Sequence, residues 1–250
     1  MVKYFWICLF MIAHVSYLNA QNTNVMVRAK AKDAKFIGSS IGGAYIVVKD
    51  DATNQVLAEG VTKGTTGDSE IIMEKPHQRR APLSDGETAG FKAELDLERP
   101  TLLKIEAHAP MNAKQAEIVS STKVWAIPGK DIKGDGVVLE VPGLIVDILT
   151  PQRHETLKAE TEIEIKANLV MMCGCPLTED GLWKADNHEV KALITSDDHE
   201  DQEIELQLTE KINTFSGSVK LPSGFHTITV YAYDETIGNT GVSKTNIIVD

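Results

Sequence analysis

Apolar and polar residues alternate along many short stretches of this chain, and clusters of Gly, Pro, Asp and Asn separate these stretches. A period of two is that of a β-strand with one buried face. No stretch carries the long 3.6-residue period of an amphipathic helix. Short alternating strands between turn residues are typical of all-β sandwiches. Strands are predicted at 25–31, 44–50, 101–109, 136–141, 162–172, 189–194, 203–208 and 226–234.

One set of strands gives way to another near residue 143, in the sequence EVPGLIVDILTP. The letters VPG end the first set. LIVDILTP begins the second with a strand that stops at a proline, because proline cannot donate to a sheet ladder. The roughly 230 residues after the N-terminal segment suffice for two modest domains, each with its own core. The predicted fold class is therefore all-β, with two consecutive antiparallel β-sandwich domains at 24–142 and 143–250.

The second half carries a pattern that resembles the bacterial immunoglobulin-like modules of exported proteins. It begins with VDILTPQRHETL and ends with GFHTITVYAYDETIGNTGVSKTNIIV at 224–249. In those modules the penultimate strand reads His-Thr-Ile-Thr-Val-x-Ala-x-Asp, a Gly-Asn turn follows, and the last strand runs to the domain end. The resemblance implies the fold but no ligand, because such modules serve as spacers, adhesins and enzyme appendages alike.

The first half is similar to transthyretin-like and carboxypeptidase-regulatory-like modules over residues 24–142. The stretch GGAYIVVKDDATNQVLAEGVTKGTTGD carries this similarity, with a strand ending in Asp and a turn into the next strand. Asn54 stands where glycine is usual, and asparagine tolerates the left-handed backbone conformation that such a hairpin needs. The segment 77–90, HQRRAPLSDGETAG, fits no strand and is predicted to be an exposed loop.

The first twenty residues, MVKYFWICLFMIAHVSYLNA, indicate export. Lys3 gives the N-terminal region a positive charge, residues 5–15 form an apolar core, and Ala20 is a small residue at a plausible cleavage site. The pattern predicts a cleaved signal peptide at 1–20, because it is too short for a spanning helix and turns polar abruptly. The expected location is the periplasm or the outside of a bacterial cell, with no membrane span left in the mature protein.

The formal charge of −11 narrows the classes of partner. A strongly acidic exported protein is not expected to bind nucleic acid or anionic lipid, because it would repel their phosphates. The chain has no Asn-x-Ser/Thr acceptor for glycosylation, which favours a bacterial envelope over a glycosylating secretory pathway. Other envelope or secreted proteins are therefore the expected partners.

Sulfur side chains gather in one stretch, MMCGCP at 171–176. Both cysteines that lie outside the predicted signal peptide are in it. Alternation along EIEIKANLVMMC places Met171 and Cys173 on the core side of a strand, and Met172 on the opposite side. The glycine and proline that follow end this strand. The long loop that comes next lies at the end of a sandwich, where binding sites are common.

Three interpretations of this stretch compete. In the first, Cys173 and Cys175 bind copper or another soft metal ion, assisted by Met172 and His188. In the second, the two cysteines form a redox-active disulfide, because a ring closed between residues two apart is strained and strained disulfides are labile. In the third, the pair closes as a structural disulfide of the loop in an oxidising compartment.

Catalysis is not predicted, apart from the thiol–disulfide role just named. The chain has no Gly-x-Ser-x-Gly, no His-Glu-x-x-His and no glycine-rich phosphate loop before a helix. The first hypothesis is an exported, non-catalytic envelope binding protein with copper as its candidate cofactor. The alternative is a structural or assembly subunit that docks onto other envelope proteins or an exported redox complex. In that case Trp183 and the loop 77–90 are the contact residues, and Cys173–Cys175 is a structural disulfide.

Overall fold

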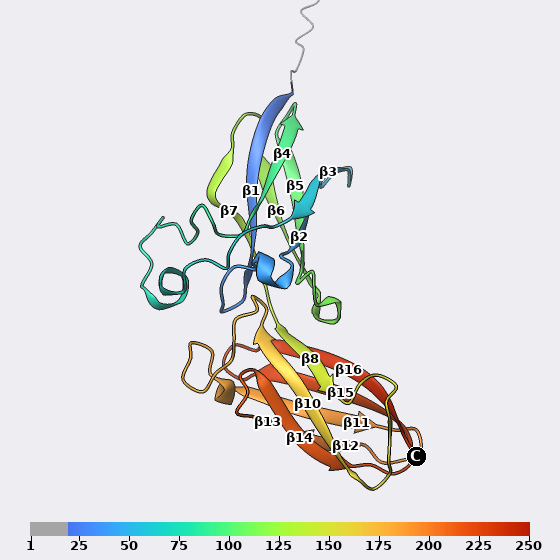
Figure 1. Ribbon diagram of the computed structural model, residues 1–250. Coiled ribbons are helices and arrows are strands. Elements are labelled where there is room, and N and C mark those ends of the chain that lie inside the picture. Colours follow the sequence, from blue (N-terminus) through green and yellow to red (C-terminus); the bar gives the residue numbers. More distant parts are fainter. Residues whose placement is uncertain (1–19) are drawn as a thin grey trace, which may run out of the picture.

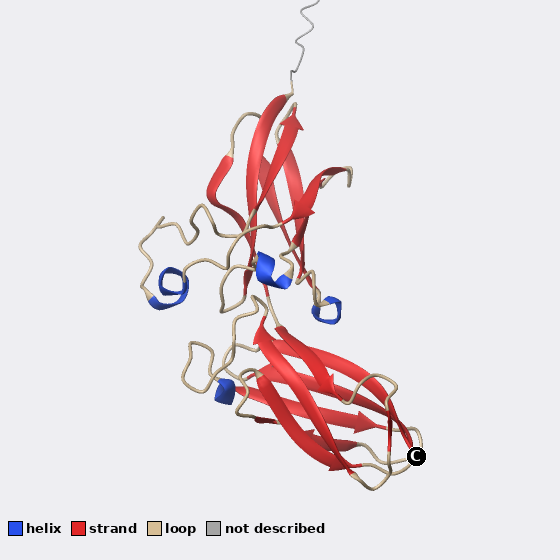
Figure 2. Ribbon diagram, viewed as in Figure 1, coloured by secondary structure: helices blue, strands red, loops and turns tan. Residues whose placement is uncertain are grey.

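The computed structural model describes residues 20–250, which form sixteen β-strands and four short helical turns (Figure 2). The longer strands belong to four sheets that pack in pairs as two sandwiches, one after the other along the chain (Figure 1). This confirms the predicted all-β fold class. The predicted signal peptide at 1–20 lies outside the described residues, apart from Ala20. Within the described part, no helix is long and apolar enough to cross a membrane.

The first sandwich consists of a three-stranded sheet in the order β4-β1-β7 and a four-stranded sheet in the order β3-β2-β5-β6. Neighbouring strands are antiparallel except β1 and β7, which pair in parallel. Alternate residues of both sheets face inward, and Val25, Val27, Leu103 and Ile105 among them are fully buried. The elements are β1 (Gln21–Ala31), η1 (Ser39–Ile41), β2 (Tyr45–Asp50), β3 (Val56–Val61), η2 (Glu70–Glu74), β4 (Phe91–Leu97), β5 (Thr101–Ala109), η3 (Lys114–Ala116), β6 (Ile118–Ala126) and β7 (Ile132–Val141).

The hairpin between β2 and β3 has the turn that the sequence predicts. The carboxylate of Asp50 accepts hydrogen bonds from the backbone N–H groups of Ala52 and Thr53 at 2.8 and 3.1 Å. The N–H of Asn54 donates to the carbonyl oxygen of Asp50 at 2.8 Å. Asn54 has φ 58°, so the expectation that asparagine takes the left-handed position usually held by glycine is confirmed.

The long connection between β3 and β4 contains the loop predicted at 77–90. No strand occurs in it and most of it is exposed, as expected, although Thr88 near its end is buried. The loop is fixed near its middle rather than free along its length. The carboxylate of Asp135 accepts hydrogen bonds from the backbone N–H groups of Leu83 and Ser84 at 3.0 and 2.9 Å.

The second sandwich has a four-stranded sheet in the order β13-β14-β10-β8 and a five-stranded sheet in the order β12-β11-β15-β16-β9. Taken in chain order, these strands occupy the places of A, A′, B, C, C′, D, E, F and G in an immunoglobulin domain, with ABED in one sheet and CFG in the other. The immunoglobulin-like fold predicted for this half is therefore confirmed. The elements are β8 (Leu144–Thr150), β9 (Thr156–Leu157), β10 (Glu162–Met171), η4 (Ala185–Asn187), β11 (His188–Thr195), β12 (Gln202–Glu205), β13 (Gln207–Leu208), β14 (Thr214–Lys220), β15 (Gly224–Asp234) and β16 (Thr240–Val249).

The single strand predicted at 203–208 is wrong, because this segment crosses from one sheet to the other. Strand β12 pairs with β11, whereas β13 pairs with β14 in the opposite sheet. The crossing point is Leu206, which is 3% exposed and donates its N–H to the carbonyl oxygen of Val190 at 2.8 Å. An alternating pattern does not reveal such a change of sheet, because the buried face stays buried on both sides of the crossing.

The two sandwiches are joined directly, since β7 ends at Val141 and β8 begins at Leu144. Pro142 and Gly143 form the whole link. A link of two residues keeps the facing ends of the sandwiches close together. The division of the chain at residue 143 stays a prediction about which parts fold on their own.

On the outer face of the β3-β2-β5-β6 sheet, the carboxylate of Glu106 has a lowered pKa, and its protonation should change the stability of the protein. Glu106 lies 2.7 Å from the Nζ atoms of Lys49 and Lys104. Hydrogen bonds from Lys104 and Lys49 lower the pKa of Glu106 from its ordinary value to about 2. A carboxylate with a depressed folded-state pKa adds stability above its unfolded pKa, and this stability is lost as the pH falls through the folded pKa.

We therefore expect the stability of the wild type to fall relative to that of Glu106→Gln between about pH 4.5 and about pH 2. Urea unfolding at successive pH values measures the difference. Parallel pH profiles for the two proteins would contradict this assignment of the charge network.

Candidate functional site

Strand β10 leads into the sulfur-rich stretch at the end of the second sandwich that faces the first. Its core side follows the predicted alternation, with Leu169 and Met171 fully buried. The chain then turns tightly: the N–H of Gly174 donates to the carbonyl oxygen of Met171 at 2.7 Å, and the N–H of Met171 donates to that of Cys175 at 3.0 Å. In this turn Cys173 and Cys175 form a disulfide bond. The two residues are 1% and 6% exposed, so the bond is covered.

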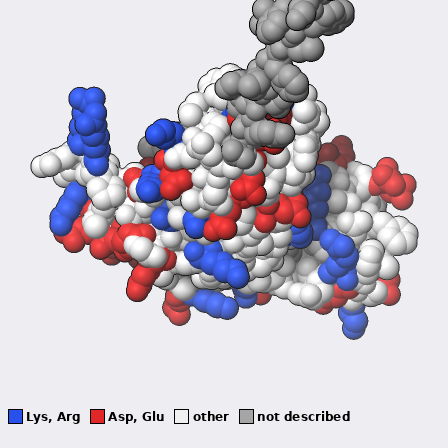
Figure 3. All heavy atoms as spheres, turned by 90° about the horizontal axis from the view of Figure 1, so that it is seen from above, with Lys and Arg blue, Asp and Glu red and all other residues white. Residues whose placement is uncertain are grey.

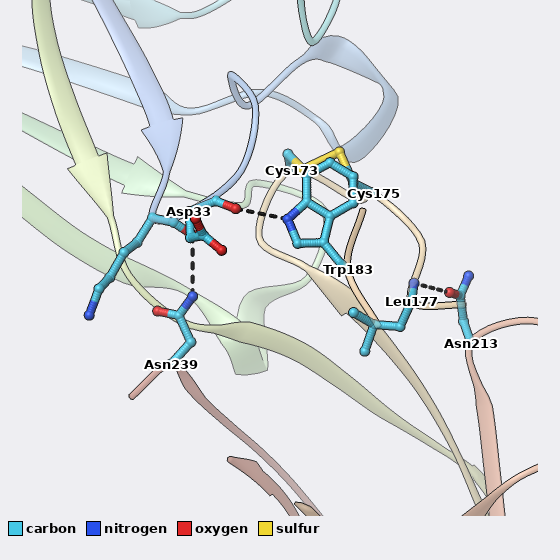
Figure 4. The surroundings of a disulfide bond; sticks show 8 residues. Asp33, Cys173, Cys175, Leu177, Trp183, Asn213 and Asn239 are labelled. Atoms are coloured by element: carbon cyan, nitrogen blue, oxygen red, sulfur yellow. Dashed lines mark hydrogen bonds between the residues drawn. A yellow bond between two sulfur atoms is a disulfide. The ribbon is translucent and has the colours of Figure 1, made fainter. Parts of the chain in front are cut away.

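The disulfide turn that contains Cys173 and Cys175 (Figure 4) lies with its tip, Gly174, against Ile41 of η1 in the first sandwich. A Cβ atom at Gly174 would lie 2.5 Å from Cγ2 of Ile41, which is closer than van der Waals contact permits. Gly174 also has φ 75°, a conformation that residues with side chains rarely adopt. Both the backbone conformation and the contact with Ile41 therefore require glycine here. We call the region where the two sandwiches meet, around Gly143, Gly174 and Ile41, the joint.

Trp183, in the loop after the disulfide turn, also reaches the first sandwich. Its indole N–H donates to the carbonyl oxygen of Asp33, in the turn after β1, at 2.8 Å (Figure 4). The loop is held by backbone hydrogen bonds from Thr178 to Trp183 at 3.0 Å and from Ala185 to Thr178 at 2.9 Å. Trp183 is 8% exposed. Under the assembly-subunit alternative Trp183 is a contact residue for another protein, whereas the contact found is with the first half of the same chain.

The turn between β15 and β16 makes a third connection through Asn239, which is 1% exposed. Its side-chain oxygen accepts the N–H of Gly143 in the link at 3.0 Å, and its side-chain nitrogen donates to the carbonyl oxygen of Lys32 at 3.2 Å. The ammonium group of Lys32 in turn donates to the carbonyl oxygen of Ile237 at 2.7 Å. A single buried amide thus connects the link, the second sandwich and the first.

Replacing Asn239 with alanine is expected to lower the free energy of unfolding by about 1–3 kcal/mol, because the buried N–H of Gly143 loses its partner. Asn239→Asp keeps the acceptor for the Gly143 N–H but removes the donor to Lys32, so its loss relative to the wild type contains the bond across the joint and the cost of a buried carboxylate. The alanine variant loses both hydrogen bonds. Denaturant unfolding measures both. A loss below about 0.5 kcal/mol for Asn239→Ala would contradict a structural role for this amide.

Three ionisable side chains lie near the joint: Asp33, His188 and Asp234. Burial, and then the negative charge of Asp234, raise the pKa of Asp33 above its ordinary value. Nε2 of His188 lies 3.5 Å from Oδ2 of Asp234, and its Nδ1 hydrogen-bonds the carbonyl oxygen of Lys184 at 2.9 Å. His188 is therefore held through Nδ1, whereas its buried Nε2 has no hydrogen-bond partner within residues 20–250.

The structure brings together two of the four residues predicted to bind a metal. Cys173 and Cys175 are bonded to each other. Met172 lies in the turn that follows β10, since the strand ends one residue before it, and it is 1% exposed because its methyl group packs beside Gly143 in the link. His188 interacts elsewhere. In the described part of the chain, no group of three or more His, Cys, Asp or Glu side chains is placed to hold a metal ion. Copper binding stays a prediction.

Three residues that form the joint were not found from the sequence: Ile41, Asp33 and Asn239. Asn239 lies in the Gly-Asn turn of the immunoglobulin-like pattern, so its position was visible but its buried contacts were not. Ile41 and Asp33 lie in turns of the first half and belong to no motif. Only an expectation of which loops face each other across the link could have identified them.

No protein-family model matches this chain, and no curated protein matches it. Solved structures that are similar to it include an engineered protein, which is 13% identical with a TM-score of 0.33 over 47% of this chain and 22% of that one. The fibronectin(III)-like modules of Clostridium thermocellum CbhA are 12% identical, with a TM-score of 0.30 over 92% of this chain and 94% of that one.

The chicken interferon gamma receptor alpha chain is 12% identical, with a TM-score of 0.34 over 92% of this chain and 98% of that one. The chain thus spans about a fifth of the engineered protein and nearly the whole of the other two. The immunoglobulin-like assignment of the second sandwich rests on its own strand order.

Proposed function

We propose that this chain is an exported, non-catalytic binding and assembly module of the bacterial envelope. Its two sandwiches present their outer surfaces to other envelope or secreted proteins at a fixed mutual orientation. An immunoglobulin-like sandwich is a scaffold for binding or structural roles, and its loops and faces decide which. Export and the identity of the partner are parts of the proposal.

The observation that carries this proposal is the position of the disulfide turn and Trp183 between the sandwiches. A loop at the end of a sandwich is commonly a free binding surface. Here Gly174 packs against Ile41, and Trp183 bonds to Asp33, in the chain's own first half. Domains in one chain move relative to each other unless their interface is well packed. This joint therefore favours a module whose geometry is fixed.

The position of the disulfide favours a structural role over a catalytic redox role. Thiol–disulfide exchange requires a thiolate to attack one of the two sulfur atoms, so its rate depends on access. Cys173 and Cys175 are 1% and 6% exposed. An attacking thiolate would need the surrounding residues to move first, which is a poor arrangement for a redox catalyst and a suitable one for a structural disulfide.

Purification of the protein, expressed at its native level, from the cellular compartment in which it occurs tests the proposed function. We expect a native assembly in which the chain and at least one different protein occur in a fixed stoichiometry, measured by native mass spectrometry. Recovery of the chain without any stoichiometric protein other than itself would contradict an assembly role. A chain found only in the cytoplasm would contradict export.

Copper binding is a second candidate, favoured by the buried soft donors Met172, Cys173 and Cys175 in one short stretch. It requires the disulfide to be converted to two thiols by a dithiol reductant, which is itself oxidised to a disulfide. The reduced protein should then bind about one Cu(I) ion, with a thiolate-to-copper absorption band that is absent in Cys173→Ser/Cys175→Ser. No binding by the reduced protein would eliminate this candidate.

A further inference from the structure

A cleft of about 480 Å³ opens on the second sandwich, beside the joint. The loop that follows the disulfide turn forms one wall, and the β13–β14 hairpin forms the other. Leu177, Leu208 and Ile212 line it with apolar groups, and Ile212 is 54% exposed. Leu182, in the same loop, is 48% exposed. We call this the acidic cleft because its charged lining residues are Glu179, Asp180 and Glu210.

The acids of the acidic cleft are available to a partner. Glu179, Asp180 and Glu210 are all exposed. Within residues 20–250 none of the three forms an ion pair. Exposed apolar side chains beside unpaired like charges fit a partner segment that carries cations together with an apolar side chain.

The first sandwich presents a segment with these properties. The basic tip, which we define as residues 75–80 with the sequence KPHQRR, is exposed throughout and carries three full positive charges. Lys75 pairs with Glu70 at 2.8 Å, whereas Arg79 and Arg80 have no ion-pair partner in the described part of the chain. Ile71, just before the tip, is 42% exposed. A basic projection is unusual on a chain with a formal charge of −11.

The loop that carries the basic tip and the loop that forms one wall of the acidic cleft lie on the same side of the molecule, one on each sandwich (Figure 1). In Figure 3 Lys and Arg side chains project from the left-hand edge, where Figure 1 places the loop that carries the tip. The turn after β1 connects the two regions, because Asp33 accepts the Trp183 bond and the Phe36 N–H donates to the Thr66 carbonyl oxygen at 3.1 Å. This turn thus contacts both the loop of the cleft and the segment that leads to the tip.

We propose that the acidic cleft receives the basic tip of a second copy of this chain, in a reciprocal dimer with two-fold symmetry. Two complementary features on one side of a molecule allow each copy to donate its tip and accept the other's, so the contact closes at two copies. The apolar floor of the cleft would receive Ile71, and its acids would pair with Arg79 and Arg80. The proposal names one partner of the assembly function proposed above and rests on it.

Sedimentation equilibrium of the purified chain at about 0.15 M salt tests the dimer, since repulsion between distant charges is then largely screened. We expect a monomer–dimer equilibrium. Arg79→Glu/Arg80→Glu and Glu179→Arg/Asp180→Arg should each raise the dimer dissociation constant about tenfold or more, because each turns attraction into repulsion at both contacts. Lys130→Glu/Lys133→Glu, a matched charge reversal at exposed positions of the first sandwich, should leave it unchanged.

A mixture of the two contact variants gives the sharpest outcome. Each variant alone opposes like charges, whereas a heterodimer of the two has complementary charges at both contacts. Equal mixing should therefore restore dimers. A wild-type chain that stays monomeric at about 100 µM, a concentration well above the dissociation constant of most specific complexes, would overturn the proposed dimer. So would mixing that restores nothing, or a control variant weakened as much as the others. Such a result leaves the native assembly with a different protein, and hence the proposed function, untouched.

Discussion

Trp183→Ala is expected to lower the free energy of unfolding by about 3–5 kcal/mol and to let the two sandwiches move independently. The indole ring is 8% exposed and donates a hydrogen bond across the joint to Asp33. Its removal leaves a cavity and an unpaired carbonyl group at the same place. Denaturant unfolding measures the stability, and NMR relaxation measures whether the two sandwiches still tumble as one body.

Trp183→Phe is the matched control, because it keeps an aromatic ring and removes only the N–H donor. We expect a loss of about 1–3 kcal/mol for the unpaired carbonyl, with joint tumbling retained. An alanine variant that loses no more than the phenylalanine variant would show that ring packing contributes nothing. Unchanged tumbling in both would contradict the assignment of Trp183 to the joint.

Gly174→Ala is expected to have the second largest effect, for two separable reasons. A side chain at φ 75° costs about 1–2 kcal/mol in backbone strain. The new methyl group would also meet Ile41 at 2.5 Å, and overpacking of this kind costs about 1–3 kcal/mol. Ile41→Ala in the same chain makes room for the methyl group, so it should remove the second cost and leave the first.

Unfolding of the wild type, both single variants and the double variant completes a thermodynamic cycle across the joint. We expect a favourable coupling energy of about 1 kcal/mol or more between Gly174→Ala and Ile41→Ala, because residues in contact are not additive. The two positions are 133 residues apart in sequence, so coupling between them reports contact between the sandwiches. Additive effects would mean that the disulfide turn does not rest on η1.

The sequence predicted well what depends on neighbouring residues. Alternation along β10 gave the correct buried side, and the left-handed turn at Asn54 followed from the turn chemistry of asparagine. For Cys173 and Cys175 the spacing allowed a metal site, a redox pair or a staple. It could not choose, because that choice depends on what covers the sulfur atoms.

The joint itself could not be predicted, because its contacts join segments far apart in sequence. Met172 follows β10, and a pattern of alternation cannot reveal that the link packs against its side chain. The amide of Asn239 bonds to Lys32, 207 residues away. The change of sheet at Leu206 was missed for the same reason. Each of these depends on how complete elements pack, whereas hydrophobic periodicity reports one element at a time.

Residual dipolar couplings from backbone amides of both sandwiches, measured in one alignment medium, show whether the joint is fixed. We expect a single alignment tensor to fit the couplings of both sandwiches in the relative orientation of the structure. Two tensors of clearly different magnitude would mean that the sandwiches move independently, and would contradict a fixed joint.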